Sequence, residues 1–321
     1  MAGLRQVLGV EVHAGNEHAA RHTQPGLLKI LDGLPEARKP KLVRGDCAFG
    51  NDPLMTALEE RQQPYLFKLK LSKNVKRHIT RLFRESGWSN AGQGWEGKGG
   101  ALTLTGWLQP RRVVVLRRPV QGEVLLAGED NGQQLLGFIE ADRSSGKQIT
   151  GYEYAVLVTN THHEILSLGQ LYRDRADAEN AFDELKNQWG WGGFTTQDMH
   201  RSELTARAVA LVYNWWSWYV RAANPQARRE ALTSRPLLLA AVGRATHSGG
   251  RTELHLTPMH AEVGLIRTMI ANIQAAIAYV RRAAEQLPKI DRWRVLVGYI
   301  CERITGQTVL PTPPPVLAGG G

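Results

Sequence analysis

Residues 167–189, with the sequence SLGQLYRDRADAENAFDELKNQW, form the stretch that decides the fold of this chain. Within it, four side chains follow one another at spacings of three, four and seven residues: Tyr172, Arg175, Glu179 and Lys186. Because an α-helix turns once in about 3.6 residues, these spacings place all four side chains on one helix face. The pattern therefore predicts a single helix over 167–189 that ends before Gly190.

The polar face of this predicted helix combines one carboxylate with a phenol, a guanidinium and an ammonium group. A carboxylate can hold a divalent cation, while cationic and hydroxyl groups can bind the oxygens of a phosphate backbone. The simpler interpretation is a solvated helix that is slightly stabilised by charge pairs at i and i+4. The simpler interpretation suffices for one such pair, whereas the four residues together favour contact with a nucleic acid.

Strand and helix patterns alternate on the N-terminal side of this stretch. The predicted elements are strand 4–13, helix 24–33, strand 41–43, helix 52–62, strand 64–70 and helix 73–84. Between Gly87 and Tyr154 the sequence is rich in glycine and in β-like runs, and helical periodicity returns from Ser167 to about residue 304. This order predicts an α/β core that is interrupted by a separate β-rich unit.

The chain of 321 residues has 40 Lys and Arg against 30 Asp and Glu, a net charge of +10 that favours polyanionic partners. The surplus is concentrated between Arg61 and Arg84, where eight residues are basic and none is acidic. Such a run is often only a solvated face, but its length favours contact with DNA phosphates. The candidate contact residues here are Lys68, Lys70, Lys73, Lys76 and Arg77.

Cysteine content and hydropathy exclude several classes of protein. The two cysteines, Cys47 and Cys301, are too few for a disulfide scaffold or a cysteine-based zinc site. The N-terminus lacks the apolar run of a signal peptide, and the apolar stretch 204–220 is short for a membrane span. We therefore expect a cytoplasmic protein without a membrane partner.

The four-residue pattern resembles the Y-R-E-K signature of insertion-sequence DDE transposases. Neighbouring segments resemble, more narrowly, the insertion-sequence 1380 group of the insertion-sequence 4-like superfamily. The resemblance extends from about residue 4 to about residue 260. The segments that carry it are Arg44-Gly45-Asp46, FGN at 49–51, PYLFKL at 64–69, GQGWEG at 92–97, NQWGWGGF at 187–194 and NWW at 214–216.

The resemblance implies an RNase-H-like catalytic core in which two aspartates and a glutamate bind two Mg²⁺ ions for DNA strand cleavage and transfer. It makes Asp46 the second aspartate and Glu179 the glutamate, so both are implied catalytic and metal-binding residues. It also implies three contacts to strand phosphates, from Tyr172, Arg175 and Lys186. Just beyond the helix, Trp189 and Trp191 have two open interpretations, stacking on DNA or anchoring the helix end.

The chain departs from the family pattern at the first aspartate. The acids before Asp46 are Glu11, Glu17, Asp32 and Glu36, and none has the sequence context of that aspartate. The resemblance therefore implies an N-terminally truncated transposase whose core lacks its first strand. We expect it to be inactive alone, since two carboxylates do not readily hold two divalent cations and a phosphate.

Three alternatives stay open: a non-catalytic DNA-binding remnant or trans-inhibitor of a full-length transposase, an upstream part that another chain supplies, and a product that does not fold stably. The implied partners are DNA, as transposon ends and target, together with full-length transposase or a second copy in a dimer. The predicted organisation is 1–86, first part of the RNase-H-like core; 87–160, β-rich insertion; 161–225, rest of the core with the signature helix; 226–305, helical C-terminal region; and 306–321, disordered tail.

Overall fold

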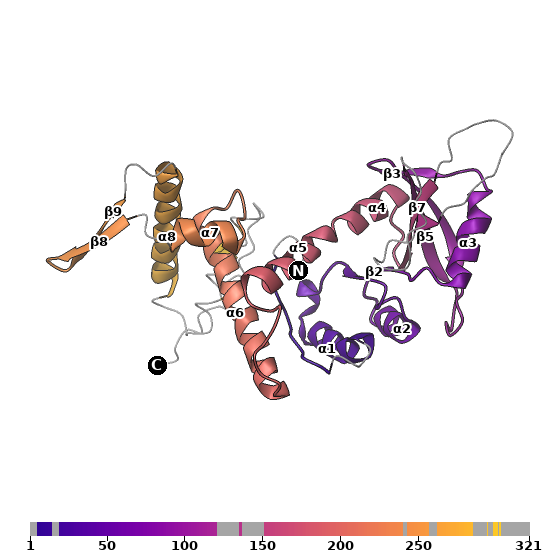
Figure 1. Ribbon diagram of the computed structural model, residues 1–321, viewed down its shortest axis with the longest axis horizontal. Coiled ribbons are helices and arrows are strands. Elements are labelled where there is room, and N and C mark those ends of the chain that lie inside the picture. Colours follow the sequence, from indigo (N-terminus) through magenta and orange to yellow (C-terminus); the bar gives the residue numbers. More distant parts are fainter. Residues whose placement is uncertain are drawn as a thin grey trace, which may run out of the picture. The chain divides into compact units, whose positions relative to one another are not determined.

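A computed structural model describes residues 5–14, 19–120, 135–136, 151–239, 243–256, 262–284, 294, 298–300 and 302 (Figure 1). The predicted tail, 306–321, lies outside these residues. The chain divides into two compact units, and each is described by itself. The sheet unit comprises His13–Asp177, and the helical unit comprises Gly3–Val12 together with Ala178–Gly321.

One mixed sheet organises the sheet unit. Its strands are β1 (Val43–Gly45), β2 (Tyr65–Lys68), β3 (Ser89–Gly92), β4 (Trp95–Leu102), β5 (Arg111–Val120), β6 (Leu135–Leu136) and β7 (Gly151–Thr159). They run in the order β1-β2-β7-β5-β4-β3, with β6 paired to β7. β1 and β2 are parallel, and the other pairs are antiparallel. β1 is the last strand at its end of this order, and in the described residues it pairs with β2 alone.

The region 87–160 is β-rich, as the sequence predicts, but its strands do not form a separate sheet. β7 pairs directly with β2, so that Phe67 lies opposite Val158, and β5 follows β7 in the same sheet. β5 and β7 are rich in valine, and both of their faces are buried. Because a strand with two apolar faces needs a packed layer on each side, these strands occupy the middle of the sheet.

Helices supply the two layers. Residues of α2 (Asp52–Glu60) and α3 (Lys73–Phe83) share one buried cluster with β5 and β7, which also receives Leu27, Leu28 and Leu31 of α1 (Ala19–Gly33). On the opposite side, Leu168 of α4 (Ile165–Arg173) shares a cluster with Val114 and Leu157. A short 3₁₀ turn, Glu36–Arg38, joins α1 to β1. The described sheet unit is thus three layers deep.

The expected strand at 4–13 is absent from the described residues 5–14. Its residues up to Val12 belong to the helical unit, where the backbone of Val7 bonds to the side chain of Asn214. The Val7 N–H donates to Asn214 Oδ1 at 2.9 Å, and Asn214 Nδ2 donates to the Val7 carbonyl at 2.8 Å. A side-chain amide therefore satisfies the backbone groups that a strand ladder would have used.

The helical unit contains α5 (Ala176–Gln188), whose first two residues fall in the sheet unit, α6 (Met199–Ala223), α7 (Ala231–Leu238) and α8 (Val263–Ala284) (Figure 1). It also holds a hairpin of β8 (Gly243–Ser248) and β9 (Arg251–Leu256). This hairpin interrupts a region that the periodicity of the sequence predicts to be helical. Its signal was Gly249-Gly250 at the turn, both with positive φ, between two short alternating runs.

α8 is long and apolar enough to cross a membrane by length and composition, over Val263–Arg282. One such helix is weak evidence, since helices that pack inside soluble proteins pass the same test. In the helical unit Ile266 and Met269 of this helix are buried, and Asn272 Nδ2 donates to the carbonyl of Ala223 in α6 at 2.8 Å. These contacts give α8 a packing role beside α6.

Candidate functional site

Asp46 follows the carboxyl end of β1 and is exposed. Its Oδ1 accepts a hydrogen bond from the Ala48 N–H at 2.9 Å, which closes a tight turn after the strand. Gly45 is required before it, because a Cβ there would lie 2.8 Å from Phe49 Cβ. The local sequence thus presents one carboxylate to solvent at the end of a strand in the parallel pair.

The helix predicted over 167–189 is not continuous: α4 ends at Arg173 and α5 begins at Ala176. In an unbroken helix the Leu171 carbonyl would accept the Arg175 N–H. Here it accepts Arg44 Nη1 at 2.7 Å, and the Arg175 N–H bonds to the Tyr172 carbonyl at 3.2 Å. A side chain from β1 therefore occupies the carbonyl at which the helix breaks.

This hydrogen bond connects two parts of the predicted site. Arg44 lies two residues before Asp46, and Leu171 directly precedes Tyr172. The half-buried Tyr172 packs on the cluster around Leu168, and Arg175 Cζ lies 5.9 Å from the centre of its ring. This bond thus ties the Asp46 strand to the end of α4, which carries Tyr172, just before the break that holds Arg175.

The segment GQGWEG at 92–97 belongs to the β3–β4 hairpin, which packs against α4. A Cβ on Gly97 would collide with Ile165 Cγ2, and one on Gly169 would lie 2.6 Å from the Ala91 carbonyl oxygen. Arg173 Nη1 donates to that same carbonyl oxygen at 2.8 Å. Glycines at these points let the helix approach the β3–β4 hairpin closely, which positions the end that carries Tyr172.

Gly97→Ala is expected to lower the free energy of unfolding by about 1–3 kcal/mol, because the methyl group would press on Ile165 and Leu116 in a packed layer. Gly99→Ala is the matched control, since Gly99 lies on the same side of β4 with nothing within 4 Å of an added Cβ. Urea denaturation of both variants measures the difference. Equal losses would contradict this account of the α4 contact.

Glu179 and Lys186 lie on α5 in the helical unit, and both side chains are exposed. Seven residues separate them, so they share one side of the helix about 10 Å apart along its axis. Asp46, Tyr172 and Arg175 belong to the sheet unit. Of the five residues that the resemblance assigns to the site, three therefore belong to the sheet unit and two to the helical unit.

Carboxylates are suitable Mg²⁺ ligands, and Asp46 and Glu179 are both exposed enough to take that role. Over the parts of the chain that the structure describes, no three His, Cys, Asp or Glu side chains lie close enough together to hold a metal ion. The described residues thus offer single carboxylate donors rather than an assembled metal centre.

The opposite side of α5 makes contacts that sequence analysis missed. Glu184 is 1% exposed; its Oε1 accepts the Ala231 N–H at 3.0 Å and its Oε2 accepts Arg228 Nη2 at 2.6 Å. Gln188 Oε1 accepts the Leu232 N–H at 2.7 Å. Two α5 side chains therefore satisfy N–H groups at the start of α7, which fixes α5 in its unit. Nothing in the local pattern around Glu184 distinguishes it from a solvated acid.

Trp189 and Trp191 pack inside the helical unit. Trp189 meets Tyr213 and Trp216 edge to face, at ring distances of 6.1 and 6.5 Å. Trp191 Nε1 donates to the Ala206 carbonyl at 3.2 Å. These contacts match the interpretation in which the two rings anchor the end of α5 on α6, and a contact with DNA stays a prediction.

The basic stretch is carried by β2, the turn after it and α3. Val75, Ile79 and Leu82 face the core, which confirms the predicted amphipathic helix, and the basic side faces outward. Lys70, Lys73 and Arg77 are exposed, whereas Lys68 and Lys76 are half-buried. The structure thus presents part of the predicted phosphate-binding set on one outer helix face.

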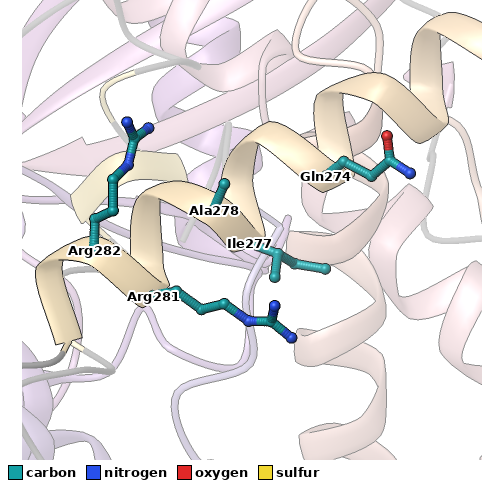
Figure 2. A pocket seen from close by; sticks show the side chains of 5 residues that line it. All are labelled: Gln274, Ile277, Ala278, Arg281 and Arg282. Atoms are coloured by element: carbon teal, nitrogen blue, oxygen red, sulfur yellow. The ribbon is translucent and has the colours of Figure 1, made fainter. Parts of the chain in front are cut away.

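A hollow of about 580 Å³ lies along α8, and it contains none of the residues that the sequence predicts for the site (Figure 2). The residues that line it are Gln274, Ile277, Ala278, Arg281 and Arg282. All five are on one helix, at spacings that place them on one side of it. Among the described residues its lining offers two arginines and one amide as polar groups, and we assign it no role.

A family model described as the transposase DDE domain matches residues 2–215. The match includes Asp46 and the whole segment from Tyr172 to Lys186. No curated protein matches the chain.

Proposed function

Because the chain belongs to the family of transposase DDE domains, we propose that it is an insertion-sequence transposase of the insertion-sequence 1380 group, with an RNase-H-like core. The observation that carries this proposal is the family match over residues 2–215, a range that includes Asp46 and the segment from Tyr172 to Lys186. The Arg44 bond to Leu171 supports it, since it ties the Asp46 strand to the end of α4 that carries Tyr172. DNA is the general partner of this family.

Members of this family generally depend on divalent metal ions, which stabilise the attacking and leaving oxygens of a phosphodiester. We propose that Asp46 and Glu179 each contribute a carboxylate to Mg²⁺ binding. Arg175 and Lys186 would bind strand phosphates near the cut, and the Tyr172 hydroxyl would donate to a phosphate oxygen. No three metal-ligating side chains lie together among the described residues, so the role proposed for each carboxylate is that of a single ligand.

The test is a nicking assay on supercoiled DNA that carries the ends of the insertion sequence, with Mg²⁺ or Mn²⁺. If the chain cleaves DNA by itself, Glu179→Gln and Asp46→Asn are expected to abolish nicking without weakening DNA binding, since both are proposed to act through the metal. Asp183→Asn, an exposed acid on the same helix as Glu179, is the control and should nick like the wild type. Nicking that survives Glu179→Gln would reject Glu179 as a metal ligand.

A second candidate function is DNA binding without strand cleavage, or inhibition of a full-length transposase in trans. It is favoured by three other acids of the sheet unit, which are held by arginines: Asp32 is paired with Arg61 at 2.8 Å, and Asp52 and Glu59 are paired with Arg111. These carboxylates are engaged in ion pairs. This candidate predicts salt-dependent DNA binding that Glu179→Gln leaves unchanged and that Lys73→Glu with Arg77→Glu weakens.

A further inference from the structure

The β8–β9 hairpin exposes both of its faces. Alternation along the strands puts Arg244, Thr246 and Ser248 on one face, with their cross-strand partners His255, Glu253 and Arg251. On the other face Ala245, His247, Thr252 and Leu254 are exposed as well, and Leu254 keeps 52% of its surface accessible. A sheet in a globular unit normally buries one face. Both faces of the hairpin are therefore available for contact with a partner rather than for packing in the core of its own unit.

The β8–β9 hairpin has regular strand pairing although neither of its faces is buried. Six residue pairs hold its register, and Gly249 and Gly250 form the turn with φ of 56° and 73°. Two cross-strand contacts reinforce it, Thr246 Oγ1 with His255 Nε2 at 3.0 Å and His247 Nδ1 with Thr252 Oγ1 at 2.8 Å. Since an isolated two-stranded hairpin is only marginally stable in water, binding a partner would stabilise this arm further.

The charges of the hairpin indicate the chemistry of that partner. Arg244 and Arg251 lie on the same face, near opposite ends of the ribbon, with hydroxyl groups of Thr246 and Ser248 beside them. Arg251 pairs with Ser248, four residues along the strand from Arg244, so the two arginines are about 13 Å apart. Glu253, the single acid of the hairpin, lies 3.7 Å from His255 Nε2. Such a face suits a polyanion that offers phosphates at several points.

We propose that the β8–β9 hairpin is a DNA-binding arm whose polar face enters the major groove of duplex DNA, with Arg244 and Arg251 on backbone phosphates. A two-stranded ribbon fits this groove, which is about 12 Å wide. The proposal rests on the proposed function, in which DNA is the partner. It adds a contact surface outside residues 2–215, the part of the chain that the family match covers.

The test is a binding titration of the full chain with a short labelled duplex of mixed sequence at several salt concentrations. Arg244→Gln with Arg251→Gln is expected to weaken binding about tenfold and to lower the slope of log K against log salt by roughly 1.8, the share of two phosphate contacts. Glu253→Gln is expected to tighten binding, because it removes the one repulsive charge. This opposite sign separates a direct contact from loss of the fold.

The matched control is Arg201→Gln with Arg267→Gln, two exposed helical arginines of the same unit with the same change in charge. Unchanged affinity and slope in the hairpin variant, or an equal loss in the control, would overturn the proposal. Equal binding of a single strand, or a hairpin variant that alters self-association instead of DNA binding, would do so too. If the wild-type chain binds no DNA, the proposed function fails together with this inference.

Discussion

Replacing Arg111 by methionine is expected to lower the free energy of unfolding by about 3–5 kcal/mol at neutral pH. The Arg111 side chain is 3% exposed and donates from three nitrogens. Nη1 bonds to Asp52 Oδ1 at 2.5 Å, Nε to Glu59 Oε1 at 2.7 Å and Nη2 to Thr56 Oγ1 at 2.9 Å. Methionine fills a similar volume but leaves two largely buried carboxylates without their cation, which is the costly outcome.

The network around Arg111 joins β5 to α2, the helix that follows the Asp46 turn. Asp52 Oδ1 also accepts the Leu108 N–H at 3.0 Å, and Glu59 Oε1 accepts the Tyr65 hydroxyl at 2.6 Å. One guanidinium thus organises groups from α2, β2 and the loop before β5. Its loss would loosen the layer on which the Asp46 turn rests.

The carboxyl groups of Asp52 and Glu59 determine whether the protein gains or loses stability as the pH falls. Burial raises the pKa of Asp52 and of Glu59, but hydrogen bonds from Arg111 and its charge outweigh burial, so each pKa is lowered. A lowered pKa in the folded state stabilises the fold above the ordinary values of 3.8 and 4.5. The stabilisation is lost as the pH falls through the lowered pKa values. The wild-type sheet unit should therefore weaken in acid.

In Arg111→Met the same carboxyl groups are buried without a cation, so burial now raises each pKa. Stability of the variant should then increase as the pH falls from 7, because protonation removes the buried charge. The difference between wild type and variant should narrow toward pH 4. Urea denaturation at several pH values measures it, and a constant difference would contradict the assignment to buried charge.

Arg118→Met is the matched control for this experiment. Arg118 lies on the same strand and pairs with Glu153 at 2.6 Å, but its side chain is 48% exposed. Because a solvent-exposed ion pair contributes little, the control should lose less than about 1 kcal/mol. A comparable loss in both variants would show that burial of the Arg111 pair is not what matters.

Glu184→Gln is expected to destabilise the helical unit by about 3–5 kcal/mol, since it leaves the buried Arg228 without its counter-ion. The two side chains are 0% and 9% exposed, and Arg228 Nη2 lies 2.6 Å from Glu184 Oε2. The Ala231 N–H would still have an amide oxygen as its acceptor. The start of α7 would lose the negative charge that stabilises a helix N-terminus. Glutamine has nearly the same shape, so the loss measures charge rather than volume.

Hydrogen exchange followed by mass spectrometry would locate the effect of Glu184→Gln. Protection is expected to fall in α5 and α7 and to stay unchanged in β5 and β7, because the pair lies within the helical unit. Asp183→Asn is the control: this neighbouring acid is exposed and accepts a hydrogen bond only from Asn187 among the contacts described, at 2.7 Å. Equal loss of protection in both variants would reject the buried pair as the cause.

The sheet shows how far local sequence patterns could predict this fold. Two of the β-like runs after Gly87, 111–118 and 151–158, match β5 and β7, but their partners could not be read from the runs themselves. Valine-rich strands are buried on two faces, and this composition is the same in a separate β unit and in a shared sheet. Pairing of β7 with β2 depends on contacts between residues far apart in the chain, such as Phe67 and Val158.

The candidate site shows the same division. The sequence placed Tyr172, Arg175, Glu179 and Lys186 on one helical repeat, and the residues do lie on or beside helices. Periodicity could not reveal that Arg44 takes the carbonyl of Leu171, because that partner lies 127 residues away. The expectation of a continuous helix was therefore wrong at Asp174 and Arg175, where α4 gives way to α5.

By itself the sequence determined what neighbouring residues control, the amphipathic helix α3 and its outward basic face, and it also matches the transposase DDE domain over residues 2–215. The tertiary structure alone decided which strands share the sheet, where α4 ends, and which charges are buried. Arg111 and Glu184 look like ordinary solvated residues in the sequence. They are buried because Asp52 and Arg228, 59 and 44 residues away, meet them in the fold and offset the cost of taking a charge out of water.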